Sequence, residues 1–456
     1  MATPGGQRVR QRLVLVVFPV QSHITSMLQL ATILHSKGFS ITIVHPLLNS
    51  PNSSNHPEFT FVPISDNMAE TKLVSPSYFI SVLNKNCVRP FEECMDQMLQ
   101  TEEQHDRITC IIYDALTYFA QDVADSFKLA GINVRTSNAA SMLAYAVVRR
   151  PDDQGYIFFP DCMPEETSVI QSLNLKDIIQ SMPQKERDVM VEQRAALIAL
   201  TDSVKKASAI IVNTMDFLEQ EIVMKTQEHF STTIFTIGPF HKLAPTISST
   251  SILEEDATCI SWLNKQVPKS VIYVSFGSVA KMNENELLET AWGLANSEQP
   301  FLWVVRPGLV RDVDWLDLLP KGFAERIGER GCIVKWAPQK EVLAHVAVGG
   351  FWSHCGWNST LESICEGIPM LCRPFFGDQL LNVRYVCDVW KVGLELESEL
   401  DRVKIVRAVR RLMVDTEGED IRQRAMEFKK KVDHCLRESG SSLNGLNELA
   451  EKILSV

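Results

Sequence analysis

Polar side chains that can bind an anion flank a predicted turn between a strand and a helix in the last third of the chain. His354 follows the short strand-like run 350–352, Gly356 permits a tight turn, and Asn358 and Ser359 open a predicted helix. The first amides of a helix have no partner within it, and the helix dipole places partial positive charge there. His354 can donate a further hydrogen bond to the same anion. These residues therefore predict a phosphate site.

Two further side chains extend this phosphate site toward a nucleotide. Trp336 offers a flat aromatic face on which a base can stack. Glu362 offers two oxygens to a ribose diol, as acidic residues do in dinucleotide sites. Each residue has an ordinary structural alternative, because Ser359 and Glu362 match a capping box and Trp336 and Trp357 can be core aromatics. Taken one at a time the residues favour the structural alternative, and taken together they favour a nucleotide site.

A histidine and an aspartate follow two predicted strands of the N-terminal half. His23 comes after the strand Leu13–Val17, and Asp114 directly follows the strand Ile108–Tyr113. In a parallel sheet both positions lie at the carboxyl edge, so the two side chains can meet although they are far apart in the chain. Imidazole is a suitable general base at neutral pH, and a carboxylate on its second nitrogen fixes the tautomer and stabilises the imidazolium. The alternatives are that His23 only starts a helix and that Asp114 only caps one.

Short β-branched runs alternate with longer helical patterns in both halves, which predicts parallel sheets with right-handed crossovers. The predicted strands are Leu13–Val17, Phe39–Val44, Ile108–Tyr113, Ile132–Arg135, Ser270–Phe276, Phe301–Val305, Cys332–Lys335, Gly350–Trp352 and Ile368–Cys372. The predicted helices are Ile24–Lys37, Tyr118–Leu129, Glu284–Leu294, Asn358–Cys365 and four that start near Gln379, Asp401, Ile421 and Leu443, with Gly440 as a helix stop before the last. Such sheets bind ligands at the carboxyl ends of their strands, near the switch point in strand order.

The composition of the chain changes around residues 238–258, where Gly, Pro and Ser become frequent. Gly238-Pro239, Ala244-Pro245 and the polar run Ser248–Ser251 indicate a linker there. The sequence thus predicts an α/β fold of two doubly wound, Rossmann-like domains. We expect the N-terminal domain at 1–240, the linker at 241–256 and the C-terminal domain at 257–436.

Composition and charge narrow the class of protein. The 456 residues are 45% hydrophobic and 22% charged, as in ordinary globular proteins of two or three domains. Acidic residues outnumber basic ones by 56 to 45, the opposite of what a nucleic acid or an anionic membrane would require of its main partner. No apolar run approaches the roughly 20 residues of a membrane span. The 11 cysteines include no CxxC pair, so we expect reduced thiols in a cytoplasmic protein.

One 44-residue segment carries a family resemblance; it runs from Trp336-Ala337-Pro338-Gln339 through His354-Cys355-Gly356-Trp357-Asn358-Ser359 and Glu362 to Phe376-Gly377-Asp378-Gln379. It resembles the signature box of plant family-1 UDP-sugar glycosyltransferases in length and at nearly every defining position, and the resemblance covers essentially the whole chain. The resemblance implies the GT-B fold, in which two Rossmann-like domains face each other across a cleft. The N-terminal domain would bind the acceptor and the C-terminal domain UDP-glucose. By the same resemblance, a helix in 437–456 packs back on the N-terminal domain.

The resemblance also implies a role for each matching position. In that family the positions of Trp336, Ala337 and Gln339 contact uracil, Glu362 holds the ribose, Ser278, His354, Asn358 and Ser359 hold the diphosphate, and Asp378 and Gln379 bind the sugar. A terminal Gln379 with Trp357 in the box goes with glucose as the donor sugar, whereas galactose-using members tend to end in His. Thr136, after the strand Ile132–Arg135, is a further expected sugar contact.

In the resembling family the positions of His23 and Asp114 carry the base and its partner. The implied reaction is a direct displacement with inversion, in which His23 removes the acceptor proton and UDP leaves without a metal or other cofactor. The stretch Phe39–Phe61 looks like a subgroup that acts on cytokinins, small hydroxy acids and terpenoids, so the expected acceptor is a small, largely apolar metabolite. We expect UDP-glucose and this acceptor as the only partners of a monomer that binds neither nucleic acid nor membrane.

The turn before His23 departs from the family pattern. Members read Phe-Pro, two further residues and then Gln-Gly-His-(Ile or Leu)-Asn-Pro, whereas this chain reads Phe18-Pro19-Val20-Gln21-Ser22-His23-Ile24-Thr25-Ser26. The turn is about two residues shorter than in the family, so the family pattern does not fix the orientation of the His23 ring. A non-catalytic relative that binds a nucleotide sugar or small molecule as a sensor is therefore an alternative.

Two other functions are less favoured by the sequence. An NAD-dependent oxidoreductase would suit two Rossmann-like halves, but it needs a G-x-G-x-x-G after a first strand, and neither half has one. Asp312 and Asp314 form a D-x-D pair that would hold a metal in another glycosyltransferase fold. No predicted strand leads into this pair, so we interpret it as solvated acidic residues.

Overall fold

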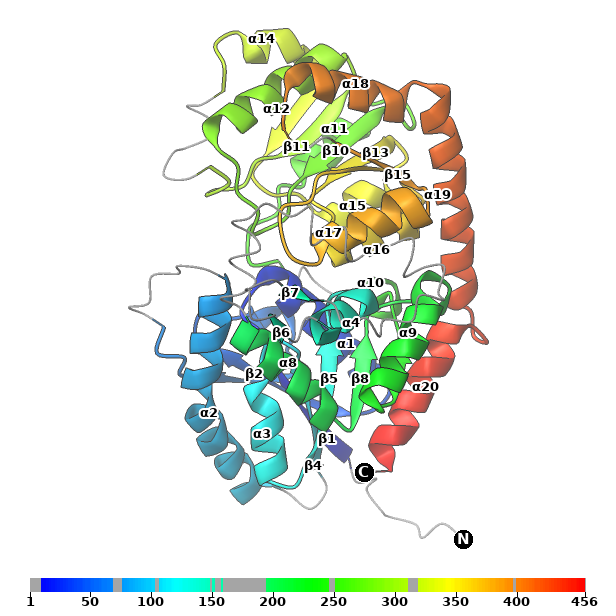
Figure 1. Cartoon of the computed structure of the whole chain (residues 1–456). Helices are drawn as coiled ribbons and strands as arrows, with labels where there is room; N and C mark the ends of the chain where they lie inside the picture. The colour runs from blue at the N-terminus through cyan, green and yellow to red at the C-terminus, as the bar shows by residue number, and fades with distance from the viewer. Residues whose placement is uncertain are drawn as a thin grey trace. The chain divides into compact units, whose positions relative to one another are not determined.

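The computed structural model describes residues 10–68, 76–102, 106–147, 150–151, 157–158, 194–245, 251–310, 319–396 and 399–455. These residues form two compact units (Figure 1). The N-terminal unit contains the described residues up to Ile252 together with those from Cys435 onward, and the C-terminal unit contains the described residues of Leu253–His434. The division after Ile252 lies inside the range predicted as a linker.

A seven-stranded parallel sheet forms the centre of the N-terminal unit, in the order β3-β2-β1-β4-β5-β8-β9. Its strands are β1 (Arg10–Val16), β2 (Ser40–Pro46), β3 (Thr60–Ile64), β4 (Asp106–Asp114), β5 (Ala130–Arg135), β8 (Ala209–Val212) and β9 (Ile234–Thr236). A separate antiparallel pair joins β6 (Arg150–Pro151) and β7 (Ile157–Phe158). The order reverses between β1 and β4, which is the switch point of this Rossmann-like sheet.

Helices cover both faces of this sheet, as the alternation along β1 shows. Leu13 and Leu15 belong to an apolar cluster with α1 (Gln21–Ser36) and α20 (Ser441–Leu454), and Val14 and Val16 to another with α2 (Pro76–Gln100) and α3 (Phe119–Ser126). A parallel strand covered on both faces needs apolar side chains throughout. The unit also contains the elements η1 (Ser53–Asn55), α4 (Ala139–Val147), α8 (Arg194–Lys206), α9 (Asp216–Phe230) and α10 (Phe240–Leu243).

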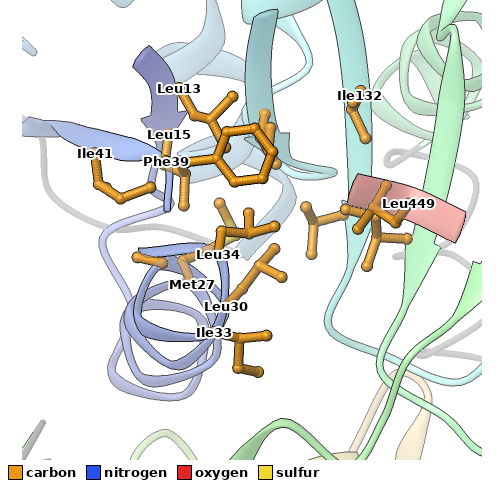
Figure 2. Close-up of a cluster of buried hydrophobic side chains, with 14 of the residues drawn as sticks. Leu13, Leu15, Met27, Leu30, Ile33, Leu34, Phe39, Ile41, Ile132 and Leu449 are labelled. Carbon is orange, nitrogen blue, oxygen red and sulfur yellow. The ribbon is translucent and has the colours of Figure 1, made fainter. Parts of the chain in front are cut away.

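The end of the chain completes the first of these clusters. Figure 2 shows Leu15, Leu30, Leu34, Ile132 and Leu449 as members of one apolar cluster, in which Leu449 comes from α20. α20 also packs against β9, and Ser442 Oγ donates a hydrogen bond to the Gly238 carbonyl at 2.7 Å. The last helix is therefore part of the N-terminal unit.

The C-terminal unit has a six-stranded parallel sheet in the order β12-β11-β10-β13-β14-β15. Its strands are β10 (Val271–Ser275), β11 (Phe301–Val304), β12 (Gly331–Val334), β13 (Val348–Ser353), β14 (Met370–Cys372) and β15 (Gly393–Glu395). Its helical elements are α11 (Thr258–Leu263), α12 (Glu284–Ser297), α14 (Phe323–Ile327), η2 (Gly328–Arg330), α15 (Gln339–Ala344), α16 (Trp357–Glu366), α17 (Gln379–Arg384), η3 (Tyr385–Val389), α18 (Arg402–Met413) and α19 (Thr416–Cys435). The switch point lies between β10 and β13. No helix in the described ranges is long and apolar enough to cross a bilayer.

Several helix ends differ from the sequence prediction, and three of the differences have a clear cause. α1 begins at Gln21 rather than near Ile24, and α19 begins at Thr416 rather than near Ile421, because apolar periodicity does not register their polar first turns. Gly440 is the N-cap of α20 and not the stop of α19, which already ends at Cys435.

Candidate active site

His23 and Asp114 meet at the switch point of the N-terminal sheet. His23 is the third residue of α1, which follows β1, and Asp114 is the last residue of β4. His23 Nδ1 lies 2.7 Å from Asp114 Oδ2. The Asp114 side chain is fully buried, and its other oxygen accepts a hydrogen bond from the Leu116 amide at 2.9 Å. The structure thus brings together the two side chains that the sequence predicts as a base and its partner.

The surroundings of His23 favour one tautomer. A buried carboxylate beside Nδ1 favours the proton on that nitrogen, which leaves the lone pair of Nε2 to accept another proton. The His23 side chain keeps 19% of its surface exposed. The Phe18 ring meets the imidazole edge-on, with 5.1 Å between centroids. His23 is therefore held in place and remains accessible.

Thr136 lies beside this pair. It follows β5, which neighbours β4 in the sheet, and its Oγ1 is 3.0 Å from His23 Nδ1. Because the Nδ1 proton is donated to Asp114, the hydroxyl oxygen of Thr136 is a second polar neighbour of that N–H group. The observed partner of Thr136 is thus the imidazole, and its contact with a sugar stays a prediction.

An early helix start accommodates the short turn before His23. The N-cap of α1 is Val20, whose carbonyl accepts the His23 amide at 2.9 Å. Thr25, which stands where the family pattern has Asn, accepts a hydrogen bond from Gln21 Nε2 at 2.9 Å inside α1. The shorter turn therefore leaves His23 within hydrogen-bonding distance of Asp114.

A second group of polar side chains lies at the switch point of the C-terminal sheet. Ser278 is in the turn after β10, and His354 directly follows β13, the neighbouring strand. α16 begins three residues after His354, and Asn358 is its second residue. Ser278, His354 and Asn358 are all partly exposed. This is the edge of the sheet at which Rossmann-like domains bind ligands.

The His354 ring lies between two glycines. A Cβ atom at Gly277 would lie 2.6 Å from His354 Nε2, and one at Gly356 would lie 2.5 Å from it. The chain turns tightly from β13 into α16 at this point, but Gly356 does not supply a left-handed conformation, because its φ of −59° and ψ of 144° suit any residue. The left-handed residue of this turn is Cys355, with φ of 62°. Glycine at 356 provides space for the imidazole instead.

His354 is a neutral hydrogen-bonding group at physiological pH. Burial lowers the pKa of His354 to about 4; the Ser275 carbonyl opposes this shift, and the Arg306 charge adds to it. A neutral imidazole can donate one hydrogen bond to an anion but contributes no positive charge.

The start of α16 excludes the capping-box alternative. The helix begins at Trp357 with Gly356 as N-cap, and no side chain caps it with a hydrogen bond. Ser359 and Glu362 lie inside the helix, so they do not cap it. Ser359 Oγ and Glu362 Oε2 instead accept hydrogen bonds from Gln339 Nε2 at 2.9 and 2.7 Å. Three predicted donor residues thus form one network.

The two tryptophans of the 44-residue segment differ in environment. Trp357 is 2% exposed, and its ring lies 6.2 Å from that of Trp390, so its side chain packs in the core as the structural alternative expects. Trp336 is partly exposed, precedes the buried Ala337, and its carbonyl accepts the Asp256 amide at 3.0 Å. Trp336 therefore keeps surface on which a base can stack.

Asp378 and Gln379 stand at the start of α17. Gln379 is 4% exposed, and its Oε1 accepts the Phe375 amide at 2.8 Å. Asn382 Nδ2 donates to Asp378 Oδ2 at 3.1 Å and to the Cys355 carbonyl at 2.8 Å. Sequence reasoning missed Asn382, although its position one helical turn after Gln379 could have indicated it. It connects the predicted sugar contacts with the His354 turn.

The acidic pair Asp312 and Asp314 lies outside the described residues. Within the described ranges, no group of three or more His, Cys, Asp or Glu side chains is arranged to hold a metal ion.

Comparisons with known proteins also indicate a glycosyltransferase that uses a UDP-sugar. A family model described as UDP-glucoronosyl and UDP-glucosyl transferase matches residues 12–427. UDP-glycosyltransferase 76B1 of Arabidopsis thaliana is 46% identical over 440 residues, which are 96% of this chain and 97% of that protein. Os79 from O. sativa, solved in complex with UDP, has a TM-score of 0.81 at 25% identity and covers 97% of this chain and 100% of its own. Phytolacca americana UGT2, solved with UDP-2fluoro-glucose and pterostilbene, has a TM-score of 0.80 at 26% identity, with coverages of 97% and 100%.

Two Rossmann-like domains together with these matches define a glycosyltransferase of the GT-B fold that uses a UDP-sugar donor. Within this class, the chain belongs to the plant family-1 UDP-glycosyltransferases.

Proposed function

We propose that this enzyme transfers glucose from UDP-glucose, with inversion, to a hydroxyl or carboxyl group of a small, largely apolar plant metabolite. The observation that carries the proposal is the contact of 2.7 Å between His23 Nδ1 and the buried Asp114 carboxylate. This contact leaves Nε2 as the basic nitrogen, which is the arrangement that a general base for a hydroxyl group requires.

The proposed reaction is a single displacement. His23 Nε2 takes the proton of the acceptor hydroxyl while the acceptor oxygen forms a bond to the anomeric carbon. The bond from that carbon to the phosphate oxygen breaks, and UDP leaves with the bonding electrons. Asp114 stabilises the imidazolium that forms. Since attack occurs opposite the leaving group, the α-linked donor gives a β-glucoside or a glucose ester.

We assign the binding of UDP-glucose to the residues of the C-terminal switch point. The proposed contacts are Trp336, Ala337 and Gln339 with uracil, Glu362 with ribose, Ser278, His354, Asn358 and Ser359 with the diphosphate, and Asp378, Gln379 and Thr136 with the sugar. Trp357 belongs to the same donor site, where it goes with glucose as the sugar. The start of α16 supports the phosphate part, because no side chain caps it and His354 lies beside it. The buried side chain of Trp357 limits that residue to a main-chain contact.

The alternative of a non-catalytic sensor is not favoured. It was motivated by the short turn before His23, but this turn leaves His23 and Asp114 in contact. A protein that only binds its ligand has no need of a buried carboxylate that fixes a histidine tautomer.

The acceptor, the assembly and the location of the enzyme are also part of the proposal. A small apolar acceptor is consistent with the stilbene pterostilbene that accompanies the donor analogue in the Phytolacca americana relative. We propose a cytoplasmic monomer that requires no metal, whose partners are UDP-glucose and the acceptor.

The test is UDP release from UDP-glucose across phenolic, hydroxy-acid, terpenoid and cytokinin acceptors, with competing UDP-sugars in parallel. His23→Ala is expected to abolish acceptor-dependent release. His35→Ala is the matched control, because His35 is exposed near the far end of the same helix. Preference for a UDP-sugar other than UDP-glucose would overturn the glucose assignment, and turnover retained by a folded His23→Ala would overturn the role of His23.

A further inference from the structure

Arg306 is a buried arginine that the proposed reaction does not use. It lies just after β11 and is 7% exposed. Its guanidinium donates to three carbonyls, those of Gly277 from Nε at 3.0 Å, Pro307 from Nη1 at 3.1 Å and Ala280 from Nη2. The carbonyls of Gly277 and Ala280 flank Ser278. Arg306 therefore fixes the shape of the turn that carries Ser278.

The charge of Arg306 has no carboxylate partner among the described residues. Carbonyls satisfy its N–H groups but carry no net negative charge, and a buried guanidinium without a counterion costs free energy. Burial accordingly lowers the pKa of Arg306. Arg373, which is equally buried in the same unit, differs because its Nη2 lies 2.5 Å from Glu286 Oε1. Of these two buried arginines, only Arg373 is neutralised.

Among the described residues assigned to the donor site, no other side chain is positively charged at pH 7. His354 is neutral at pH 7, and Glu362 and Asp378 are acids. A diphosphate brought to this group would meet two carboxylates and only the partial charges of the start of α16. Arg306, whose charge acts on His354, is close enough to offset that repulsion, because charges interact strongly where water is excluded.

We propose that Arg306 provides the positive potential that selects a nucleoside diphosphate at this site, and that the diphosphate is the counterion that Arg306 lacks among the described residues. Arg306 acts through the turn 277–280 and is a positioning residue, not a catalytic one. The inference rests on the proposed UDP-sugar site and adds the residue that distinguishes UDP from uridine. Because UDP gains negative charge when it leaves the sugar, the same potential also stabilises the leaving group.

The experiment compares the dissociation constants of UDP, UMP and uridine, measured by calorimetry at pH 7, for the full-length enzyme and three variants. Arg306→Gln removes the charge, and Arg306→Lys keeps it with fewer N–H donors. Arg411→Gln is the matched control, because it removes one positive charge that is exposed and already paired with Glu417.

For Arg306→Gln we expect the dissociation constant of UDP to rise by about tenfold or more, that of UMP by less, and that of uridine by less than about twofold. Arg306→Lys should keep the preference of the wild type for UDP over uridine to within about threefold, and Arg411→Gln should change none of the three ligands by more than about twofold.

Equal weakening of UDP and uridine binding in Arg306→Gln would overturn the inference, because it would show a purely structural role. Unchanged binding of both ligands would also overturn it, because the charge of Arg306 would then have no effect on the diphosphate. If Arg306→Gln does not fold, Arg306→Lys decides, and loss of the UDP preference in that folded variant would overturn it. A wild-type enzyme that binds no UDP would contradict the proposed function itself, so the two failures are distinguishable.

Discussion

At the scale of single residues, the chemistry of the N-terminal unit depends on which nitrogen of His23 carries the proton. Asp114 is fully buried and reaches Nδ1 at 2.7 Å. A carboxylate can only accept a hydrogen bond, so the proton belongs on Nδ1 and the base is Nε2. An amide in the same place could donate to Nδ1 and would reverse this assignment.

The variant Asp114→Asn tests this point. We expect kcat to fall by roughly 10²–10⁴, because Nε2 would carry the proton and no anion would stabilise the imidazolium. UDP binding should not change, since Asp114 is not in the C-terminal unit. Steady-state UDP release and a separate UDP titration measure the two quantities. A kcat within about threefold of the wild type would show that Asp114 does not orient the base.

Gly277 offers a second test at this scale. A side chain there would face two obstacles, a left-handed φ of 67° and the His354 ring 2.6 Å from the new Cβ. Gly322 has a comparable φ of 79° but nothing within 4 Å. The left-handed φ should therefore cost both Gly277→Ala and Gly322→Ala about 1–2 kcal/mol of unfolding free energy, and Gly277→Ala should lose more because the His354 ring must also shift. Only Gly277→Ala should weaken UDP binding, by about tenfold or more. Equal UDP affinities in the two variants, measured by titration beside thermal denaturation, would contradict this role of the glycine.

At the scale of elements, a buried carboxylate fixes the helix that follows Thr136. Glu219 of α9 is 2% exposed, and its two oxygens accept the amides of Ala139 and Ala140, the first residues of α4, at 3.2 Å each. An anion at a helix N-terminus is favourable, but its burial is not. Burial raises the pKa of Glu219 to about 7, although these hydrogen bonds oppose the shift.

This shift makes the stability of the N-terminal unit depend on pH. The folded chain holds the Glu219 proton up to about pH 7, whereas the unfolded chain releases it near the ordinary glutamate pKa of 4.5. Between these values the unfolded state binds fewer protons, so this residue's contribution to the unfolding free energy falls by about 1.4 kcal/mol per pH unit. Glu219→Gln should abolish that part of the slope, so its stability relative to the wild type should rise from pH 5 to pH 8.

Hydrogen exchange of the N-terminal unit, with chemical denaturation at several pH values, measures this effect. Glu228→Gln is the control, because Glu228 is exposed on the same helix. Parallel pH profiles for wild type and Glu219→Gln would show that Glu219 does not carry the proton.

The elements also show what the sequence can predict. Strands such as β1 and β4 were predictable because parallel strands covered on both faces need continuous apolar runs. The meeting of His23 and Asp114 followed from their places at one sheet edge. The sequence could not predict that Arg306 is buried without a carboxylate partner among the described residues, nor that Cys355 has a left-handed φ. Both features depend on contacts between segments that are distant in sequence. No local pattern records such contacts.

At the scale of the whole molecule, both units have the same kind of fold, a doubly wound parallel sheet. In each unit the polar residues gather where the strand order reverses, between β1 and β4 and between β10 and β13. The chain then returns, so that α20 completes the apolar core of the unit in which the chain begins. The stability of the N-terminal unit should therefore depend on α20, which is far in sequence from the unit's other elements.

Two leucines of α20 test this dependence. Leu449 is fully buried in the cluster that contains Leu15 (Figure 2). Leu454 of the same helix is 58% exposed. Leu449→Ala removes buried methyl groups and leaves a cavity, so it should lower the unfolding free energy by about 2–5 kcal/mol. Leu454→Ala, at an exposed position, should change it by less than about 0.5 kcal/mol.

All eight tryptophans lie between residues 262 and 390, so tryptophan fluorescence does not report directly on the N-terminal unit. Hydrogen exchange of peptides from β1 and α1 is the suitable measurement, because both contact the Leu449 cluster. Faster exchange there in Leu449→Ala, with fluorescence-detected UDP binding unchanged, is the expected result. If the amides of β1 and α1 in Leu449→Ala exchanged hydrogen at the wild-type rate, the core of the N-terminal unit would not depend on α20.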